Sequence, residues 1–66
     1  MTVTVNGKPR PLGEAQSLAD LLKALGVRAE KMAVERNGVI IPAHAFGNTP
    51  VAPGDQIEII QFVGGG

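Results

Sequence analysis

The sequence predicts an α+β domain in which a mixed sheet of four to five strands packs against one main helix. Three observations support this prediction: two Asn-Gly turns between strand-like segments, a single segment with helical leucine spacing, and a run of β-branched residues near the C-terminus. At 66 residues the chain forms one domain, and without cysteine that domain depends on packing alone. Because phenylalanine is the only aromatic residue and occurs twice, aliphatic side chains must fill the core.

The first predicted element is a hairpin at the N-terminus. Residues 2–6 alternate polar and apolar side chains, which is the pattern of a half-buried strand. Asn6 and Gly7 both tolerate the positive φ of a type I′ turn, so a second strand is expected to return over residues 8–12. Two prolines in this second strand lack an amide donor, which places it at an edge of the sheet.

The main helix is predicted in the segment SLADLLKALG. Ser17 is a favourable N-cap, Asp20 suits the positive end of the helix dipole, and Gly26 is suited to the position just past the C-terminus. Burial of the leucines stabilises the domain by on the order of 6–12 kcal/mol before chain entropy is subtracted. They form one stripe, which is expected to lie on the sheet, with spacing i, i+3, i+4 and i+7: Leu18, Leu21, Leu22 and Leu25.

A second hairpin, a short helical turn and a final strand are predicted to follow. Residues 32–37 and 39–41 flank the second Asn-Gly turn and form the hairpin. Residues 43–46 form the helical turn, which Phe46 anchors to the core. Residues 56–62 are the most strand-like run in the chain and are expected at the centre of the sheet.

The order hairpin, helix, hairpin, strand predicts how the elements are arranged. Placing the first and last strands side by side and parallel, with the helix across one face, buries the leucine stripe and obeys the connection rules. This arrangement is a β-grasp, and it is expected to occupy residues 1–62. Residues 63–66 are expected to form a flexible glycine tail, because glycine has no side chain to pack and loses the most entropy on ordering.

Composition and charge exclude several classes of function. Six basic and six acidic residues leave no net charge to attract nucleic acid or an anionic membrane. The N-terminal segment lacks the features of a signal peptide and no stretch is long enough to span a bilayer, so we expect a cytoplasmic protein. The single histidine, His44, is assigned no role. We expect no catalytic residue, no metal ligand and no cofactor bound by the chain itself.

The α-carboxylate of Gly66 is the candidate reactive group. It is ionised at neutral pH and is therefore a poor electrophile that a partner must activate. A nucleotide-using partner could convert it to an acyl-adenylate, which a sulfur nucleophile would displace to leave a thiocarboxylate. Residues 63–66 reach about 13–14 Å when extended, which is enough to enter a partner's active site.

Three segments resemble the thiamine-biosynthesis sulfur carrier family (ThiS), which is ubiquitin-like: SLADLLKALG, AVERNGVIIPAHAF and PGDQIEIIQFVGGG. The resemblance covers essentially the whole chain, and the family's terminal Gly-Gly matches Gly65 and Gly66, whereas Gly64 is a loose match. It implies a carrier protein rather than an enzyme. An E1-like adenylyltransferase that uses ATP and Mg²⁺ would adenylate Gly66, and a cysteine desulfurase or sulfurtransferase would act as the sulfur donor. The thiocarboxylate would then deliver sulfur to thiazole synthase.

The resemblance also implies an apolar docking surface for the activating enzyme. If the alternating apolar residues of the first and last strands face the helix, then Ile60 and Phe62 face the other way. Val39 and Ile41 are expected to join them, and we hypothesise that these residues bind the partner.

Three alternative functions stay open. The chain could be the related carrier that forms the small subunit of molybdopterin synthase, although its shortness argues against this reading. It could also serve as a protein-modifying tag, or it could be a β-grasp interaction module whose C-terminus is chemically inert.

Overall fold

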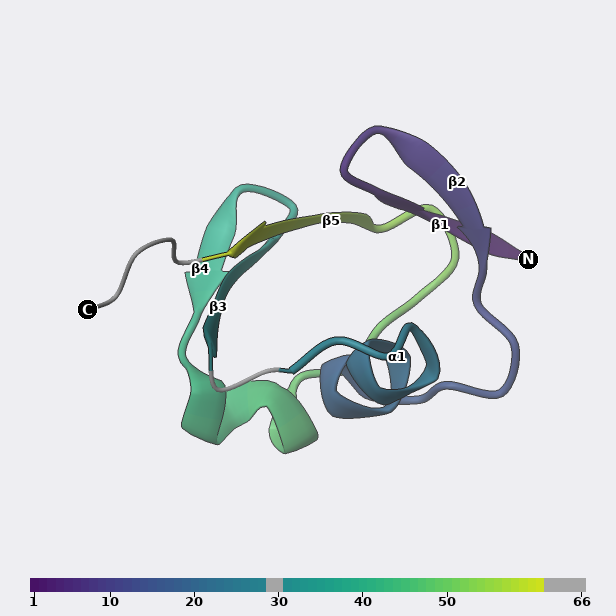
Figure 1. Ribbon diagram of the computed structural model, residues 1–66. Helices are drawn as coiled ribbons and strands as arrows, with labels where there is room; N and C mark the ends of the chain where they lie inside the picture. The colour runs from purple at the N-terminus through teal and green to yellow at the C-terminus, as the bar shows by residue number, and fades with distance from the viewer. Residues whose placement is uncertain (29–30, 62–66) are drawn as a thin grey trace.

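The residues that the structure describes form a five-stranded sheet. The computed structural model describes residues 1–28 and 31–61 (Figure 1). Along the chain the elements are β1 (Thr2–Val5), β2 (Lys8–Pro11), α1 (Leu18–Ala24), β3 (Met32–Arg36), β4 (Val39–Ile41), the 3₁₀ helix η2 (Ala43–Asn48) and β5 (Gln56–Gln61). The strands lie in the order β2-β1-β5-β3-β4, and only the central pair of β1 and β5 is parallel. The predicted α+β, ubiquitin-like β-grasp fold is therefore confirmed.

Both Asn-Gly dipeptides form the predicted turns. Asn6 and Gly7 have φ values of 51° and 82°, and Asn37 and Gly38 have φ values of 52° and 86°. Positive φ at both central residues is the requirement of a type I′ turn, which asparagine and glycine meet at low cost. Each turn leaves its two flanking strands in antiparallel register, so the local sequence sets both hairpins.

The helix α1 begins at the predicted cap. The Ser17 hydroxyl accepts a hydrogen bond from the Asp20 N–H at 3.2 Å, and the Asp20 carboxylate accepts one from the Ser17 N–H at 3.3 Å. The Gln16 and Ser17 N–H groups donate to this carboxylate and hold the pKa of Asp20 below its usual value. Just past the helix, Gly26 takes a φ of 75°, as expected of a C-terminal glycine.

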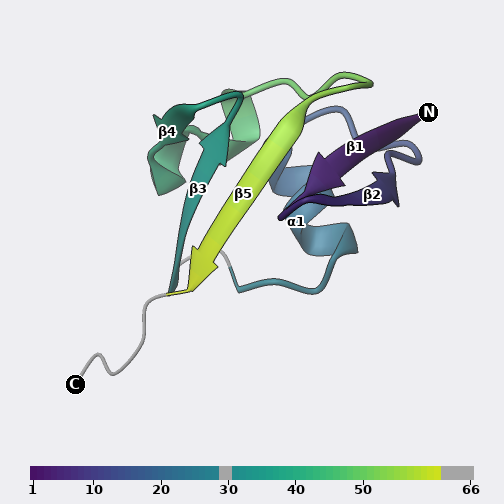
Figure 2. The same ribbon diagram turned by 90° about the horizontal axis from the view of Figure 1, so that it is seen from above.

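The core lies between the sheet and the helices. In Figure 1, α1 and η2 both lie below the sheet, and Figure 2 shows the sheet face-on with the two helices behind it. Three leucines of α1 are fully buried against the sheet, whereas Leu25 is only partly buried. Phe46 of η2 is 4% exposed and anchors this segment as predicted, although the 3₁₀ helix extends two residues further than expected.

Candidate activation and docking site

The predicted reactive end continues directly from the central strand. Gly66, Gly65, Gly64 and Phe62 lie outside the described residues, so their predicted roles stay predictions. The last described residue is Gln61, at the end of β5. Five residues of sequence separate it from Gly66. The described part of the site is therefore the end of β5 and the surfaces on either side of it.

Asn6 supports the end of β5 where β1 no longer runs beside it. The parallel ladder between β1 and β5 pairs Val5 with Ile57, and the Asn6 N–H donates to the Ile57 carbonyl at 2.9 Å. Beyond that point, the Asn6 side chain makes the hydrogen bonds to β5 that a further residue of β1 would otherwise make. Its Oδ1 accepts from the Ile59 N–H at 2.8 Å, and its Nδ2 donates to the Ile59 carbonyl at 3.3 Å. The turn residue thus also fixes the strand that leads towards the glycines.

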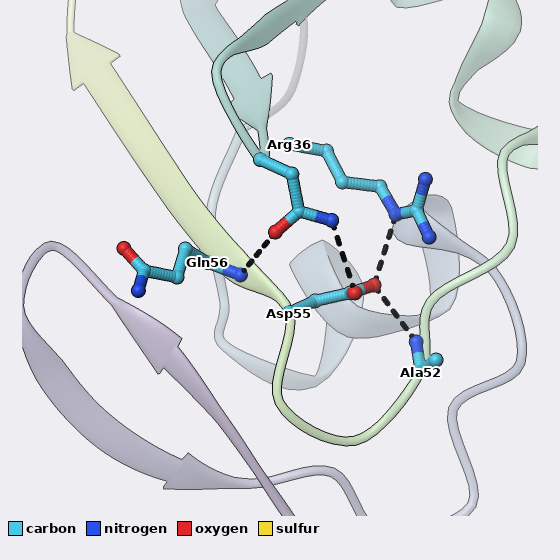
Figure 3. Close-up of polar contacts among 5 residues, drawn as sticks. Arg36, Ala52, Asp55 and Gln56 are labelled. Carbon is cyan, nitrogen blue, oxygen red and sulfur yellow. Dashed lines mark hydrogen bonds and ion pairs between the residues drawn. The ribbon is translucent and has the colours of Figure 1, made fainter.

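The other end of β5 is held by a second asparagine and a nearly buried carboxylate (Figure 3). Asn37 Oδ1 accepts from the Gln56 N–H at 2.9 Å, and Asn37 Nδ2 donates to Asp55 at 3.1 Å. Asp55 is 7% exposed and also accepts from Arg36 Nε and from the Ala52 N–H, both at 2.9 Å. The ion pair between Arg36 and Asp55 was not predicted from the sequence.

Opposing effects act on the Asp55 carboxyl. Burial by itself raises the pKa of Asp55, but hydrogen bonds from the Ala52 N–H, Asn37 and Arg36 outweigh burial and hold the pKa below its usual value of 3.8. Asp55 is therefore ionised at neutral pH and joins β3, the second Asn-Gly turn and the start of β5. Its role in the site is to position β5.

The sheet face opposite α1, here called the outer face, carries one of the predicted docking residues. Ile60 is 49% exposed and is paired with Ala33 of β3. It belongs to the outer face because successive residues of a strand alternate between faces, and its neighbour Ile59 packs against the core. The predicted placement of Ile60 is confirmed, whereas its role in binding a partner stays a prediction.

The predicted placement of Val39 and Ile41 on that same face is wrong. Ile41 pairs with Val34, which is fully buried in the core, and Val39 pairs with Arg36, two residues along β3. Directly opposed residues of neighbouring strands share a face, so both side chains lie on the helix side. The residue between them, Ile40, lies on the outer face and is 68% exposed. Ile40, and not Val39 or Ile41, is therefore the exposed apolar residue of β4 that shares the outer face with Ile60.

A groove opens beside Gln61 on the helix side of the sheet. It has a volume of about 300 Å³ and is lined by apolar side chains that include Leu25, Val27, Met32 and Ile59, together with polar residues such as Arg10. The groove could not be predicted from the sequence, because its lining comes from separate elements that meet only in the folded chain.

Side chains that could perform chemistry are sparse in the described part of the molecule. Residues 1–28 and 31–61 contain no group of three or more His, Asp or Glu side chains that could hold a metal ion. His44 lies exposed on η2. Within the same ranges, no helix is long and apolar enough to cross a membrane.

Known proteins are similar to this chain along nearly its whole length. The ThiS family model matches residues 3–66. The crystal structure of the thiamine biosynthesis protein (ThiS) from Geobacter metallireducens matches with a TM-score of 0.84 and 43% identity, and all of both chains is covered. The sulfur carrier protein ThiS of Thermus thermophilus is 33% identical over 97% of this chain and 98% of its own length.

A longer relative is a thiazole synthase from Paramagnetospirillum magneticum. It is 39% identical over all 66 residues of this chain, which spans only 20% of the length of that enzyme. The matches in sequence and in fold agree with the geometry of a β-grasp domain whose central strand leads to a glycine-rich end. The chain therefore belongs to the ThiS family, the ubiquitin-like sulfur carriers of thiamine biosynthesis.

Proposed function

We propose that this chain carries sulfur as a thiocarboxylate on Gly66 and that thiazole synthase receives the sulfur. The observation that carries this proposal is the ThiS family match, which extends through residue 66 and so includes the terminal glycine pair. The chain acts as a carrier and co-substrate, and its partner enzymes supply the catalysis. ATP and Mg²⁺ belong to the activating partner.

The proposed reaction has three steps at the Gly66 carboxyl group. In the first, a carboxylate oxygen attacks the α-phosphorus of ATP on an E1-like adenylyltransferase, and pyrophosphate leaves. In the second, the terminal sulfur of a persulfide on a cysteine desulfurase or sulfurtransferase attacks the acyl carbon, and AMP departs with one former carboxylate oxygen. In the third, a thiol cleaves the S–S bond of the resulting acyl disulfide and forms a disulfide with the donor's sulfur, which leaves the thiocarboxylate on Gly66. Activation is required because an ionised carboxylate is a poor electrophile.

The proposal that partner enzymes supply the catalysis is supported by how the candidate catalytic side chains of the described residues are arranged. His44 is exposed, and the Asp55 carboxylate is engaged by Arg36, Asn37 and the Ala52 N–H. Asp20 is likewise engaged in the helix cap. A nucleophile and a base within hydrogen-bond reach of each other are the minimum for catalysis of this type. These three groups lie in separate parts of the chain: Asp20 in α1, His44 in η2 and Asp55 just before β5.

Two comparisons support the thiazole pathway over the alternatives. The Paramagnetospirillum thiazole synthase contains a segment 39% identical to this entire chain, so carrier-like and thiazole synthase sequences occur in one polypeptide. The family match is to ThiS, which favours this pathway over molybdopterin synthesis. Thiazole synthase is therefore the proposed acceptor of the sulfur.

Intact mass measurement tests the proposal directly. The protein is incubated with the E1-like enzyme, Mg-ATP and a sulfur donor, and we expect the mass gain of one oxygen-to-sulfur exchange, which is absent when ATP is omitted. Gly66→Ala should slow the reaction, because it adds a methyl group beside the reacting carbon. Gly47→Ala is the matched control, since Gly47 has ordinary φ and nothing lies within 4 Å of the added methyl group. An unchanged wild-type mass under complete conditions would refute the proposal.

A further inference from the structure

The outer face of the sheet is acidic, although the chain as a whole is neutral. Glu35 of β3 lies directly opposite Glu58 of β5. Glu58 is two residues from Ile60, and Glu35 is next to the buried Val34, so alternation along the strands places both on the outer face with Ile60. The same register pairs Glu35 with Ile40 on its other side. Two carboxylates and two exposed isoleucines thus form one patch, here called the acidic-apolar patch.

The cations of the described strands lie on the other face. Lys8 pairs with Val5 and Arg10 pairs with Val3, and both valines belong to the core. Arg36 pairs with the buried Ile57 and donates to Asp55. The described strands therefore present two negative charges and no positive charge on the outer face.

The opposed glutamates repel one another in the free protein. Directly opposite residues of neighbouring strands have Cβ atoms roughly 4.5–5.5 Å apart, and like charges at such positions are destabilising. Among the described residues, neither carboxylate forms a hydrogen bond or an ion pair with another side chain. A cation placed between Glu35 and Glu58 would replace this repulsion with attraction to both carboxylates.

We propose that the acidic-apolar patch receives a protein surface that places an arginine or lysine between Glu35 and Glu58, and apolar side chains on Ile40 and Ile60. The inference rests on the proposed function, since its partner is the activating E1-like enzyme. β5 itself supplies Glu58 and Ile60 and then continues towards Gly66. An enzyme that acts on Gly66 must therefore approach the end of β5, close to the patch. The negative charge of the patch would attract a basic surface on that enzyme.

The rate of complex formation with the activating enzyme tests this inference. Charged rim residues affect association rates and their salt dependence more than they affect dissociation. We expect the double substitution Glu35→Gln and Glu58→Gln to slow association about tenfold at low salt, and the difference to shrink as salt screens the charges. Glu14→Gln is the control for loss of a carboxylate elsewhere, because it removes one negative charge, against two in the double variant, from an exposed loop before α1. It should change the rate by less than about twofold.

The outcomes separate this inference from the proposed function. The melting temperature of the double variant should stay the same or rise, because a like-charge pair is removed. Wild-type thiocarboxylate formation together with unchanged association of the double variant would overturn the inference and leave the proposed function standing. If Ile40→Ser slows association while the glutamine substitutions do not, the partner contact is apolar only, and the cation is likewise refuted. Absence of thiocarboxylate from the wild-type protein would instead refute the proposed function.

Discussion

Removal of the Asn6 side chain should loosen the end of β5 while leaving the rest of the sheet in place. Asn6→Gly is the informative substitution, because glycine also adopts the φ of 51° at this turn position. It removes two hydrogen bonds to Ile59, at 2.8 and 3.3 Å. A hydrogen bond contributes about 0.5–1.5 kcal/mol net, so an exposed pair with one long member should contribute about 1–2 kcal/mol. Asn6→Ala should cost roughly 1–2 kcal/mol more, because it adds left-handed backbone strain.

Native-state hydrogen exchange measures the loss of protection directly at the Ile59 N–H. The Ile59 N–H loses its acceptor in Asn6→Gly, and a free energy of about 1–2 kcal/mol corresponds to exchange that is about 5–30-fold faster. The Ile60 amide serves as an internal control, since Ile60 is paired with Ala33 on the opposite side of the strand. If Ile59 keeps its wild-type protection in Asn6→Gly, the Asn6 side chain does not hold β5 and the reasoning fails.

Three further experiments test the polar contacts and the face assignment. Asp55→Asn should lower the unfolding free energy by about 1.5–3 kcal/mol at neutral pH. The folded-state pKa of Asp55 is depressed, so this difference should be present above the usual value of 3.8 and should disappear as pH falls through the folded value, as urea titrations at several pH values would show. Ser17→Ala should cost about 1 kcal/mol by urea unfolding, because the helix loses its cap. Ile41→Ser should lower the melting temperature more than Ile40→Ser, whose side chain is 68% exposed, and the reverse order would contradict the face assignment.

Much of the fold could be predicted because its determinants are local. Asn-Gly fixes positive φ at two successive residues, and the leucine spacing of α1 fixes which helix face is buried. The central position of β5 follows from its apolar, β-branched sequence, which suits a strand with neighbours on both sides. In each case the information lies within a few residues of the element that it specifies.

The error at Val39 and Ile41 concerned register, although the sequence contained the necessary signal. A two-residue turn at Asn37-Gly38 pairs Arg36 with Val39 and therefore pairs Val34 with Ile41. Once Val34 is assigned to the core, Ile41 must follow it and Ile40 must face outward. Hydrophobicity favoured the wrong residues because all three residues of β4 are apolar and do not alternate.

The Asp55 interactions lay beyond local prediction. Arg36 and Asp55 are 19 residues apart, and they meet only because β3 and β5 pair in one particular register. The same holds for Asn6 and Ile59, which are 53 residues apart. Both asparagines could be recognised from the sequence as turn formers. Their side-chain hydrogen bonds to β5 could not be predicted, because these bonds depend on the position of β5 in the folded sheet.

The geometry of β5 also limits where a partner's active site can lie. Five residues follow Gln61, and a fully extended chain spans at most about 3.3–3.6 Å per residue, which gives an upper limit of roughly 17–18 Å. An enzyme seated on the acidic-apolar patch must therefore have its nucleotide within that distance of Gln61. Because Asn6 and Asn37 hold the two ends of β5, the patch and the origin of this span keep a fixed separation. Docking on Glu58 and Ile60 would thus also set the distance over which Gly66 must be delivered.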